Sequence, residues 1–225
     1  MTSLTAKRIL VTHADSFMGP AICRNLTAKG AEVLASNATL TTPDEAAELI
    51  LSSGRVDILV ANLSITAPTT PATDITEDEW RDTFSLLVDP LPRLCKAVLP
   101  QMIERRQGKI VVVGSAAALR GMKRTATYSA ARGAQLAYTQ ALGVEVARHN
   151  IQVNAVAQNF VDNPTYFPPQ VQADERFKAR LQREVPLGRL VSAEEDAEFI
   201  AYLCSTAADC FVGQVFPLCG GWVNR

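Results

Sequence analysis

The chain has 225 residues, with 48% hydrophobic residues, 20% charged residues and a formal net charge of −1. This length and composition are typical of one α/β domain with a substantial core, so we expect residues 1–225 to form a single domain. The charge balance, with Lys, Arg, Asp and Glu scattered along the chain, argues against a nucleic-acid-binding surface and against a polybasic membrane segment.

Short runs of β-branched residues alternate with helical patterns along the whole chain. Strands are expected at Arg8–Thr12, Glu32–Ala35, Val56–Ala61, Lys109–Gly114, Ile151–Ala157 and Gln214–Leu218. Helices are expected over Pro20–Lys29, Pro43–Ser52, a segment that starts at about Glu77, Pro92–Arg106 and Tyr128–Arg148. Continuous apolar strands that alternate with helices predict an α/β fold, a doubly wound Rossmann-like parallel sheet of about seven strands. The active site of such a sheet lies outside the carboxyl ends of its strands.

One irregular stretch, Gln158–Gln172, interrupts this alternation and holds three prolines and three aromatic residues. A loop of this length in a small domain is more often functional than idle, so we expect it to contribute to the site.

Cysteine and histidine usage argues against a disulfide framework and against a metal site. The five cysteines are an odd number without a CxxC pair, and there are two histidines. Reduced, mostly buried thiols and a cytoplasmic location are therefore expected. The polar segment from Met1 to Lys7 has no features of a signal peptide, and no apolar run approaches the roughly 18 residues of a membrane span.

Three residues stand out by their spacing: Ser115, Tyr128 and Arg132. Ser115 follows a predicted buried strand, which places its hydroxyl at the crevice. Tyr128 and Arg132 are four residues apart and share one face of a predicted helix. Each residue alone is common at such a position, whereas the three together at this spacing are a much more specific signal for catalysis.

On these residues the chain resembles the short-chain dehydrogenase/reductase family over nearly its whole length. The resemblance includes the strand before Ser115 and the segments VLPQM, NAVA, PLGRL, GQVF and CGGW. In that family a Ser, a Tyr and a Lys four residues after the Tyr form the active site, and the Lys also holds the nicotinamide ribose. Arg132 stands at the Lys position, which resembles the halohydrin dehalogenases, a cofactor-free offshoot with a Ser-Tyr-Arg triad.

The glycine-rich loop of the family is also altered here. The family pattern begins with Thr-Gly, continues with three residues and a Gly, and ends with one residue and a final Gly. This chain reads THADSFMG over Thr12–Gly19, so only the last glycine remains, and His13 and Phe17 would fill the space of a pyrophosphate. The strand that ends before Ser36 supplies no acidic residue for a ribose hydroxyl. Leu87 stands near the helix position at which many of these dehydrogenases carry an active-site asparagine. We therefore expect no nicotinamide cofactor.

The resemblance implies a mechanism for the triad. Tyr128, as phenolate, removes the proton of a substrate hydroxyl that also accepts a hydrogen bond from Ser115. The alkoxide then expels halide from the neighbouring carbon, so the expected substrates are small vicinal haloalcohols and the products are epoxides, halide and a proton. Reversal opens epoxides with azide, cyanide or nitrite.

A free phenol has a pKa near 10, and a cation about 4 Å away at an effective dielectric of ~20 stabilises the anion by about 4 kcal/mol. Arg132 therefore supplies about what a base working near pH 7 needs.

The resemblance also places a halide pocket where the dehydrogenases bind nicotinamide. The residues expected there are Phe17, Gln158, Asn159, Phe160, Val161, Tyr166 and Phe167. Backbone N–H groups of the 158–161 segment would bind the anion. For Tyr166 and Phe167, a hydrophobic lid without halide contact remains open as an alternative.

Two other functions stay open. An NAD(P)-dependent reductase with an atypical glycine loop would keep Ser115 and Tyr128 but leaves Arg132, His13 and Phe17 unexplained. A non-catalytic family member would have a damaged triad, and this one is complete. The two long helices of the family usually pair between subunits, so a homotetramer is expected by analogy.

Overall fold

Six short strands, rich in β-branched residues, form one parallel sheet. The computed structural model describes residues 3–224; Met1, Thr2 and Arg225, and with them part of the Met1–Lys7 segment, lie outside the described residues. The strands are β1 (Arg8–Thr12), β2 (Glu32–Ser36), β3 (Ile58–Asn62), β4 (Gly108–Ser115), β5 (Ile151–Gln158) and β6 (Val215–Leu218). Their order is β2-β1-β3-β4-β5-β6, and every neighbouring pair is parallel. The predicted doubly wound α/β fold is confirmed, and all six predicted strands form.

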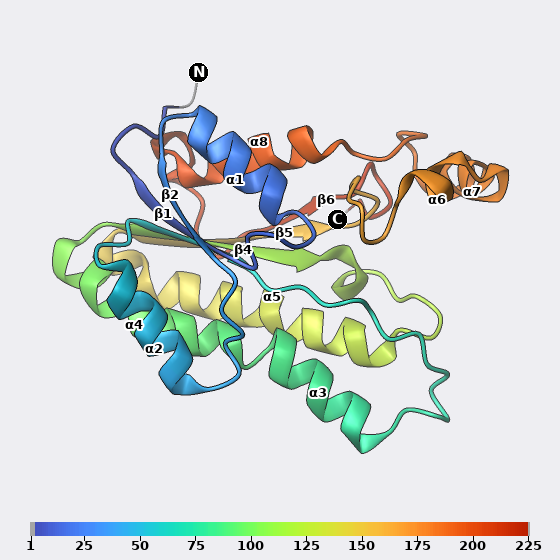
Figure 1. Ribbon diagram of the computed structural model, residues 1–225, viewed down its shortest axis with the longest axis horizontal. Helices are drawn as coiled ribbons and strands as arrows, with labels where there is room; N and C mark the ends of the chain where they lie inside the picture. Colours follow the sequence, from blue (N-terminus) through green and yellow to red (C-terminus); the bar gives the residue numbers. More distant parts are fainter. Residues whose placement is uncertain (1–2, 225) are drawn as a thin grey trace.

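Helices cover both faces of this sheet (Figure 1). One face carries α1 (Gly19–Ala28) and α8 (Ala193–Cys204), and the other carries α2 (Pro43–Ser53), α4 (Pro90–Arg105) and α5 (Ala126–Val146). Helix α3 (Glu77–Leu87) packs beside α5. Two further helices, α6 (Pro169–Ala173) and α7 (Glu175–Glu184), stand apart from the sheet in the 159–192 segment, and no predicted element corresponds to α6, α7 or α8.

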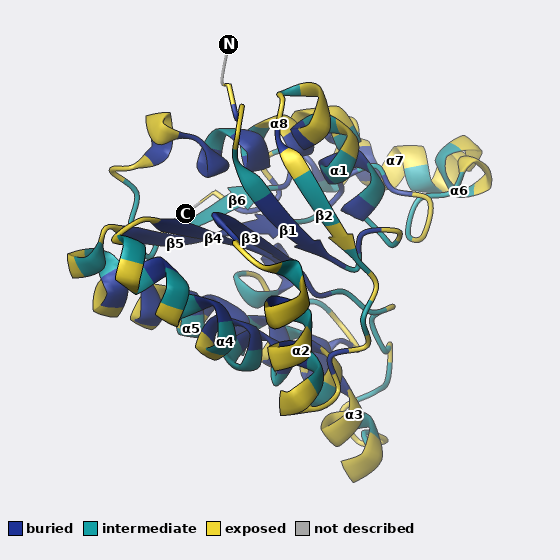
Figure 2. Ribbon diagram, turned by 60° about the vertical axis from the view of Figure 1, so that its left-hand side comes forward, coloured by how far each residue is buried: buried dark blue, intermediate teal, exposed yellow. Residues whose placement is uncertain are grey.

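The core is divided between the two faces of the sheet because successive strand residues point to opposite sides. In β1, Leu10 packs with the α2, α4 and α5 layer, whereas Ile9 and Val11 pack with the α1 and α8 layer. Figure 2 shows buried strands between helices whose outer surfaces are exposed. This burial on both sides explains why the strands are apolar without alternation.

Two helix starts are fixed by reciprocal capping. Thr42 and Glu45 form a capping box at α2, and Ser192 and Glu195 form one at α8. Such caps satisfy the N–H groups that a helix start leaves unpaired. The observed α5 begins at Ala126 rather than at the predicted Tyr128, so Tyr128 lies in its first turn.

Within residues 3–224, no helix is long and apolar enough to cross a membrane, and no cluster of His, Cys, Asp and Glu could hold a metal ion. All five cysteines are free thiols, and Cys95, Cys204 and Cys219 are buried.

β2 and β3 lie on opposite sides of β1, so the direction of the strand order reverses between β1 and β3. In open α/β sheets, ligands bind outside the carboxyl ends of the strands at such a switch point. The loops after β1, β3, β4 and β5 meet there, and the sequence places all of its candidate site residues on or beside these loops.

Candidate active site

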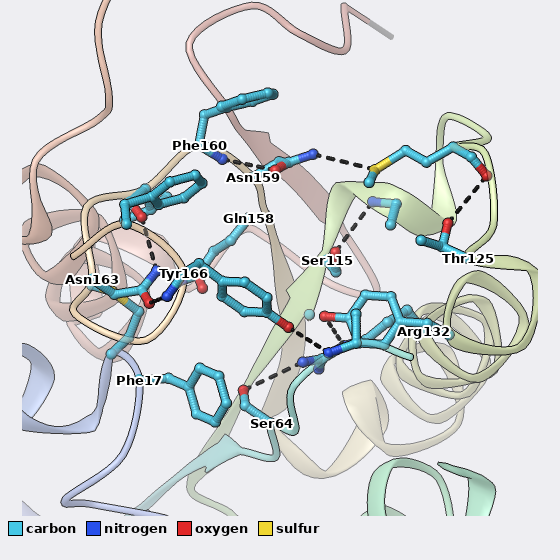
Figure 3. A pocket seen from close by; sticks show the side chains of 18 of the residues that line it. Phe17, Ser64, Ser115, Thr125, Arg132, Gln158, Asn159, Phe160, Asn163 and Tyr166 are labelled. Carbon is cyan, nitrogen blue, oxygen red and sulfur yellow. Dashed lines mark hydrogen bonds between the residues drawn. The ribbon is translucent and has the colours of Figure 1, made fainter. Parts of the chain in front are cut away.

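A cavity of about 310 Å³ opens at the carboxyl ends of the strands. Its wall contains every residue that the sequence analysis proposed for the site: Phe17, Ser115, Tyr128, Arg132, Gln158, Asn159, Phe160, Val161, Tyr166 and Phe167. Figure 3 shows the labelled members converging from separate segments of the chain. The structure therefore brings the candidate triad and the candidate halide pocket into one space.

Ser115 is the last residue of β4, where the strand turns into a short 3-10 helix. The buried Ser115 Oγ accepts a hydrogen bond of 3.2 Å from the backbone N–H of Ala117. A hydroxyl has one proton and two lone pairs. Because the backbone occupies a lone pair, the proton stays free to donate to a ligand oxygen in the cavity.

Tyr128 and Arg132 lie one turn apart on α5, as the i, i+4 spacing predicts. Arg132 Nε donates a hydrogen bond of 3.0 Å to Tyr128 Oη, and the guanidinium carbon lies 5.1 Å from the centroid of the Tyr128 ring. The guanidinium therefore contacts the atom that would carry negative charge in a phenolate, and such charge-assisted hydrogen bonds are among the strongest in proteins.

The remaining contacts of Arg132 are all to neutral groups, although the residue is only 3% exposed. Its acceptors are Leu63 O at 2.8 Å, Val113 O at 3.1 Å, Gln135 Oε1 at 2.9 Å and Ser64 Oγ at 3.3 Å. No carboxylate in residues 3–224 forms an ion pair with it. A buried cation without a counter-charge is costly, and an anion at Tyr128 or in the cavity would offset that cost.

Gln135 extends this network to α3. Its Nε2 donates to Leu87 O, and the Leu87 side chain packs in one cluster with Tyr128. Gln135 is three residues after Arg132 on the same helix face, so the spacing in the sequence could have predicted their contact. Ser64 lies two residues after the end of β3, and no sequence pattern distinguished it.

The β1–α1 loop retains the backbone shape of a glycine-rich turn without the glycines. His13 and Phe17 adopt positive φ values of 44° and 52°, a region in which side chains are unfavourable. Asn62, at the end of β3, donates to the backbone oxygens of His13 at 3.0 Å and Ser16 at 3.2 Å. Gly19 is required, because a Cβ there would lie 2.4 Å from His13 O.

Tyr166 closes the cavity from the loop after β5. Its hydroxyl accepts from Ala67 N and donates to Ile65 O, both at 2.9 Å, and its ring centroid lies 5.7 Å from that of Phe17. Burial, followed by the neighbouring Tyr128, raises the pKa of Tyr166 well above its ordinary value. Tyr166 therefore remains a neutral phenol that ties the two loops together.

The backbone of the 158–161 segment offers fewer donors than its residue count suggests. Asn159 N donates to Leu218 O at 3.2 Å, and Phe160 N donates to the side chain of Asn159 at 2.8 Å. Val161 N–H, in contrast, has no acceptor among the described residues. A buried amide without a partner is rare, which makes Val161 N–H the backbone group best suited to bind an anion here.

A family model described as enoyl-(acyl carrier protein) reductase matches residues 42–223. The 3-oxoacyl-[acyl-carrier-protein] reductase of Salmonella typhimurium is 32% identical and covers 97% of this chain and 98% of its own length. The dehydrogenase/reductase SDR family member 4 of Pongo abelii is 27% identical and covers 99% of this chain and 89% of its own length. The chain belongs to the short-chain dehydrogenase/reductase family.

Among solved structures of this short-chain dehydrogenase/reductase family, two dehalogenases are similar to the chain. A protein described as a dehalogenation enzyme has a TM-score of 0.92 at 34% identity and covers 98% of this chain and 99% of its own. A halohydrin dehalogenase bound to ethyl (2S)-oxiran-2-ylacetate has a TM-score of 0.89 at 30% identity and covers 97% and 99%. Identity to the reductases and to the dehalogenases is nearly the same, so the site residues have to distinguish the two functions.

The β1–α1 loop does not fit the pyrophosphate of the dinucleotide that reductases of the short-chain dehydrogenase/reductase family use. Four of its backbone N–H groups already have protein acceptors: Ala14 N donates to Ser36 O, Asp15 N to Asn37 Oδ1, Ser16 N to His13 O and Gly19 N to Ser16 O. The Asp15 carboxylate adds negative charge to the loop. Burial, with a smaller contribution from the charge of Arg132, lowers the pKa of His13, so His13 supplies no cation for a phosphate near pH 7.

Several cavity residues were missed by sequence reasoning. They are Met18, Ser64, Ala67, Gly114, Ala117, Met122, Thr125, Asn163, Val171, Phe177 and Arg180. Arg180 belongs to α7 and places its guanidinium 5.2 Å from the Phe160 ring centroid. Because α7 itself was not predicted, its contribution to the wall had no signal in the sequence.

Proposed function

We propose that the protein is a cofactor-independent halohydrin dehalogenase that converts small vicinal haloalcohols to epoxides with release of halide and a proton. The observation that carries this proposal is the contact of the buried Arg132 Nε with Tyr128 Oη at 3.0 Å, without a carboxylate partner for Arg132 in residues 3–224. The permanent charge of an arginine stabilises a phenolate, whereas a buried lysine loses its proton more readily.

The reaction starts with proton removal. Tyr128, as phenolate, accepts the proton of the substrate hydroxyl, while Ser115 donates a hydrogen bond to the same oxygen. The substrate oxygen then forms a bond to the neighbouring carbon as the carbon–halogen bond breaks and the halide takes the bonding electron pair. The proton passes from Tyr128 to solvent, so one halide and one proton leave for each epoxide formed.

The leaving halide requires a weak donor and polarisable walls. Val161 N–H supplies the donor, and the rings of Phe17 and Phe160 supply the walls. The buried charge of Arg132 makes the cavity favourable for an anion as a whole. Run backwards, the same arrangement opens an epoxide with azide, cyanide or nitrite.

Substrate size is consistent with this proposal. The related halohydrin dehalogenase holds an epoxide ester, and a cavity of about 310 Å³ is in the range of small-molecule sites.

The test is bromide release from a small vicinal bromohydrin without added nicotinamide. Equal amounts of bromide, proton and epoxide are expected, and Tyr128→Phe should abolish all three. Tyr138→Phe is the matched control, because Tyr138 lies on the same helix, outside the cavity wall. Release that survives in Tyr128→Phe, or no release from any of several bromohydrins, would contradict the proposal.

A second function is favoured by one observation, the 32% identity to a 3-oxoacyl-[acyl-carrier-protein] reductase. A reductase would be stabilised by its dinucleotide, so saturating NADPH or NADH should raise its melting temperature. The dehalogenase proposal predicts no such rise. A rise with consumption of NADPH on a 3-oxoacyl thioester would establish the reductase instead.

A further inference from the structure

Helix α8 buries a carboxyl group that the proposed reaction does not use. Asp196 is 0% exposed, and its Oδ2 accepts a hydrogen bond of 2.7 Å from Gln158 Nε2. Its Oδ1 is buried and has no partner among the described residues. One neutral hydrogen bond does not compensate a buried negative charge, and an apolar residue of similar size would serve stability better. A role in the stability of the fold therefore does not explain why this carboxyl group is buried.

No cation compensates Asp196 either. No ion pair among residues 3–224 involves it, and three cations on or beside neighbouring elements pair elsewhere: Lys29 after α1 with Glu198, Lys109 on β4 with Asp209, and Arg189 before α8 with Glu195. Asp196 thus interacts with one polar side chain, and that side chain belongs to the active-site wall.

Gln158 connects this carboxyl to the cavity. It is the last residue of β5 and lines the cavity next to Asn159 and Phe160. While Nε2 is held by Asp196, Oε1 accepts no hydrogen bond from the described residues. A carboxamide donates only through nitrogen and accepts only through oxygen. The end that faces the cavity therefore decides whether Gln158 attracts or repels an anion.

We propose that Asp196 is a positioning residue that links proton uptake to anion binding in the cavity. As a carboxylate, it holds the Gln158 amide by its NH₂ group and leaves the amide oxygen for the cavity. As a carboxylic acid, it donates to that oxygen and leaves the NH₂ group for the anion. One proton is then taken up from solvent for each anion bound. This inference rests on the proposed dehalogenase function, because it concerns the same anion pocket.

Ionisation in the neutral range supports this geometry. Burial raises the pKa of Asp196 to about 7, against a smaller lowering by the Gln158 hydrogen bond, so both forms are populated near neutral pH. Two other titratable groups at or near the cavity change little there, because burial lowers the pKa of His13 and raises that of Tyr166.

The experiment is a calorimetric titration with sodium bromide at constant ionic strength from pH 5.5 to 8.5. It is done in a Tyr128→Phe background, so that ionisation of this phenol contributes nothing. We expect the bromide affinity to fall as the pH rises above about 7, by up to about tenfold per pH unit for one linked proton. Asp196→Asn should remove this slope. Glu198→Gln, which removes an exposed carboxylate on the same helix, should keep it.

A second variant tests the same linkage if Asp196→Asn does not fold. Gln158→Met keeps the carboxyl and breaks the connection, so it should also lose the pH dependence of bromide affinity. Steady-state kinetics add a readout that a structural role would not move: the pH dependence of bromide inhibition should vanish in Asp196→Asn and persist in Glu198→Gln.

Bromide affinity that is independent of pH in the parent, or an unchanged slope in Asp196→Asn or Gln158→Met, would overturn the linkage and leave the dehalogenase proposal intact. No bromide binding at any pH, together with no bromide release from bromohydrins, would overturn the dehalogenase proposal and this inference with it.

Discussion

At the scale of single residues, the proposed reaction depends on the hydrogen-bond partners of one buried guanidinium group, that of Arg132. Arg132 contacts Tyr128 and four neutral acceptors, so its charge is held in a fixed place but is not neutralised. A planar fork of donors is needed to reach acceptors in several directions at once, and a lysine has no such fork. In the proposed reaction, the residue both positions Tyr128 and supplies the charge that stabilises its phenolate.

Arg132→Lys should lower kcat/KM for a bromohydrin by about 10²-fold and move the rising limb of activity to higher pH. The reason is that an ammonium group cannot keep the contacts to Leu63, Val113 and Gln135 and can lose its proton when buried. Rates measured from pH 5 to 10 test this. Arg105→Lys is the matched control, since Arg105 donates to Val56 O outside the cavity wall. An unshifted profile in Arg132→Lys would contradict the role of the guanidinium.

Asp196 should also give the free energy of unfolding a pH dependence. Its pKa is about 7 in the folded protein against an ordinary value of 3.8 for this side chain, so the folded state binds the extra proton between these values. Its contribution is complete below about pH 4 and is lost as the pH rises through about 7. The difference corresponds to roughly 4 kcal/mol at most. In urea unfolding, the free energy of unfolding of Asp196→Asn minus that of the wild type should therefore be larger at pH 8 than at pH 5. An equal difference at the two pH values would refute this.

At the scale of elements, the cavity depends on two irregular segments, the β1–α1 loop and residues 159–168 between β5 and α6. The β1–α1 loop is held by Asn62, and the loop after β5 is held by Tyr166 through the 65–67 segment. Loops positioned by a rigid sheet commonly carry binding residues. In this protein, both loops are hydrogen-bonded to residues at or just after the end of β3, which holds them on the same side of the cavity.

Tyr166→Phe should raise KM for the haloalcohol by roughly tenfold and change kcat less. The variant leaves Ala67 N–H and Ile65 C=O without their partner in the closed arrangement, at a cost of about 1–3 kcal/mol. Steady-state kinetics and the rate of limited proteolysis between residues 159 and 174 measure the effect. The control is Tyr202→Phe, whose hydroxyl donates to Ala207 O far from the cavity. A fall in kcat without a rise in KM would contradict the role of Tyr166 in closing the cavity.

Gly19→Ala should destabilise the protein by about 1–3 kcal/mol, because its Cβ would meet backbone oxygens at 2.4 Å and 2.6 Å that have no room to move. Gly133→Ala is the matched control: its Cβ would meet nothing within 4 Å inside α5, so the helix should gain up to about 1 kcal/mol. Urea unfolding of both variants tests the close approach of the loop to α1, and equal effects would contradict it.

At the scale of the whole molecule, the strand order determines which loops can meet. The reversal between β1 and β3 places the former glycine loop beside the segment after β3, while β4 and α5 deliver Ser115 and the Tyr128–Arg132 pair. A reductase and a dehalogenase can share this arrangement, since the fold fixes only where the site lies.

The family analogy predicts a homotetramer in which α4 and α5 pair between subunits. Light scattering should give a mass of four chains. Val144, which is 74% exposed on α5, should be covered in that assembly, so Val144→Glu should reduce the mass. Leu51→Glu on α2, 82% exposed outside these two helices, should not. A monomeric wild type would contradict the analogy.

From the sequence alone, both the sheet, which the structure confirms, and the candidate triad, which stays a prediction, could be named. Buried parallel strands leave continuous β-branched runs, and a shared helix face follows from a spacing of four residues, so both signals are local. The candidate pocket residues were also found, because the resemblance located the 158–167 loop by position. Helices α6, α7 and α8 had no counterpart in the predicted elements.

Only the tertiary structure decided how these groups are satisfied. Three features depend on which segments the fold brings together: within residues 3–224 Arg132 has no carboxylate partner and Val161 N–H has no acceptor, and Gln158 pairs with Asp196, 38 residues away. Hydrogen-bond partners and burial are properties of the assembled surroundings, and no residue type carries them. For that reason the sequence could name the reacting groups, whereas the electrostatics that would make them react came from the fold.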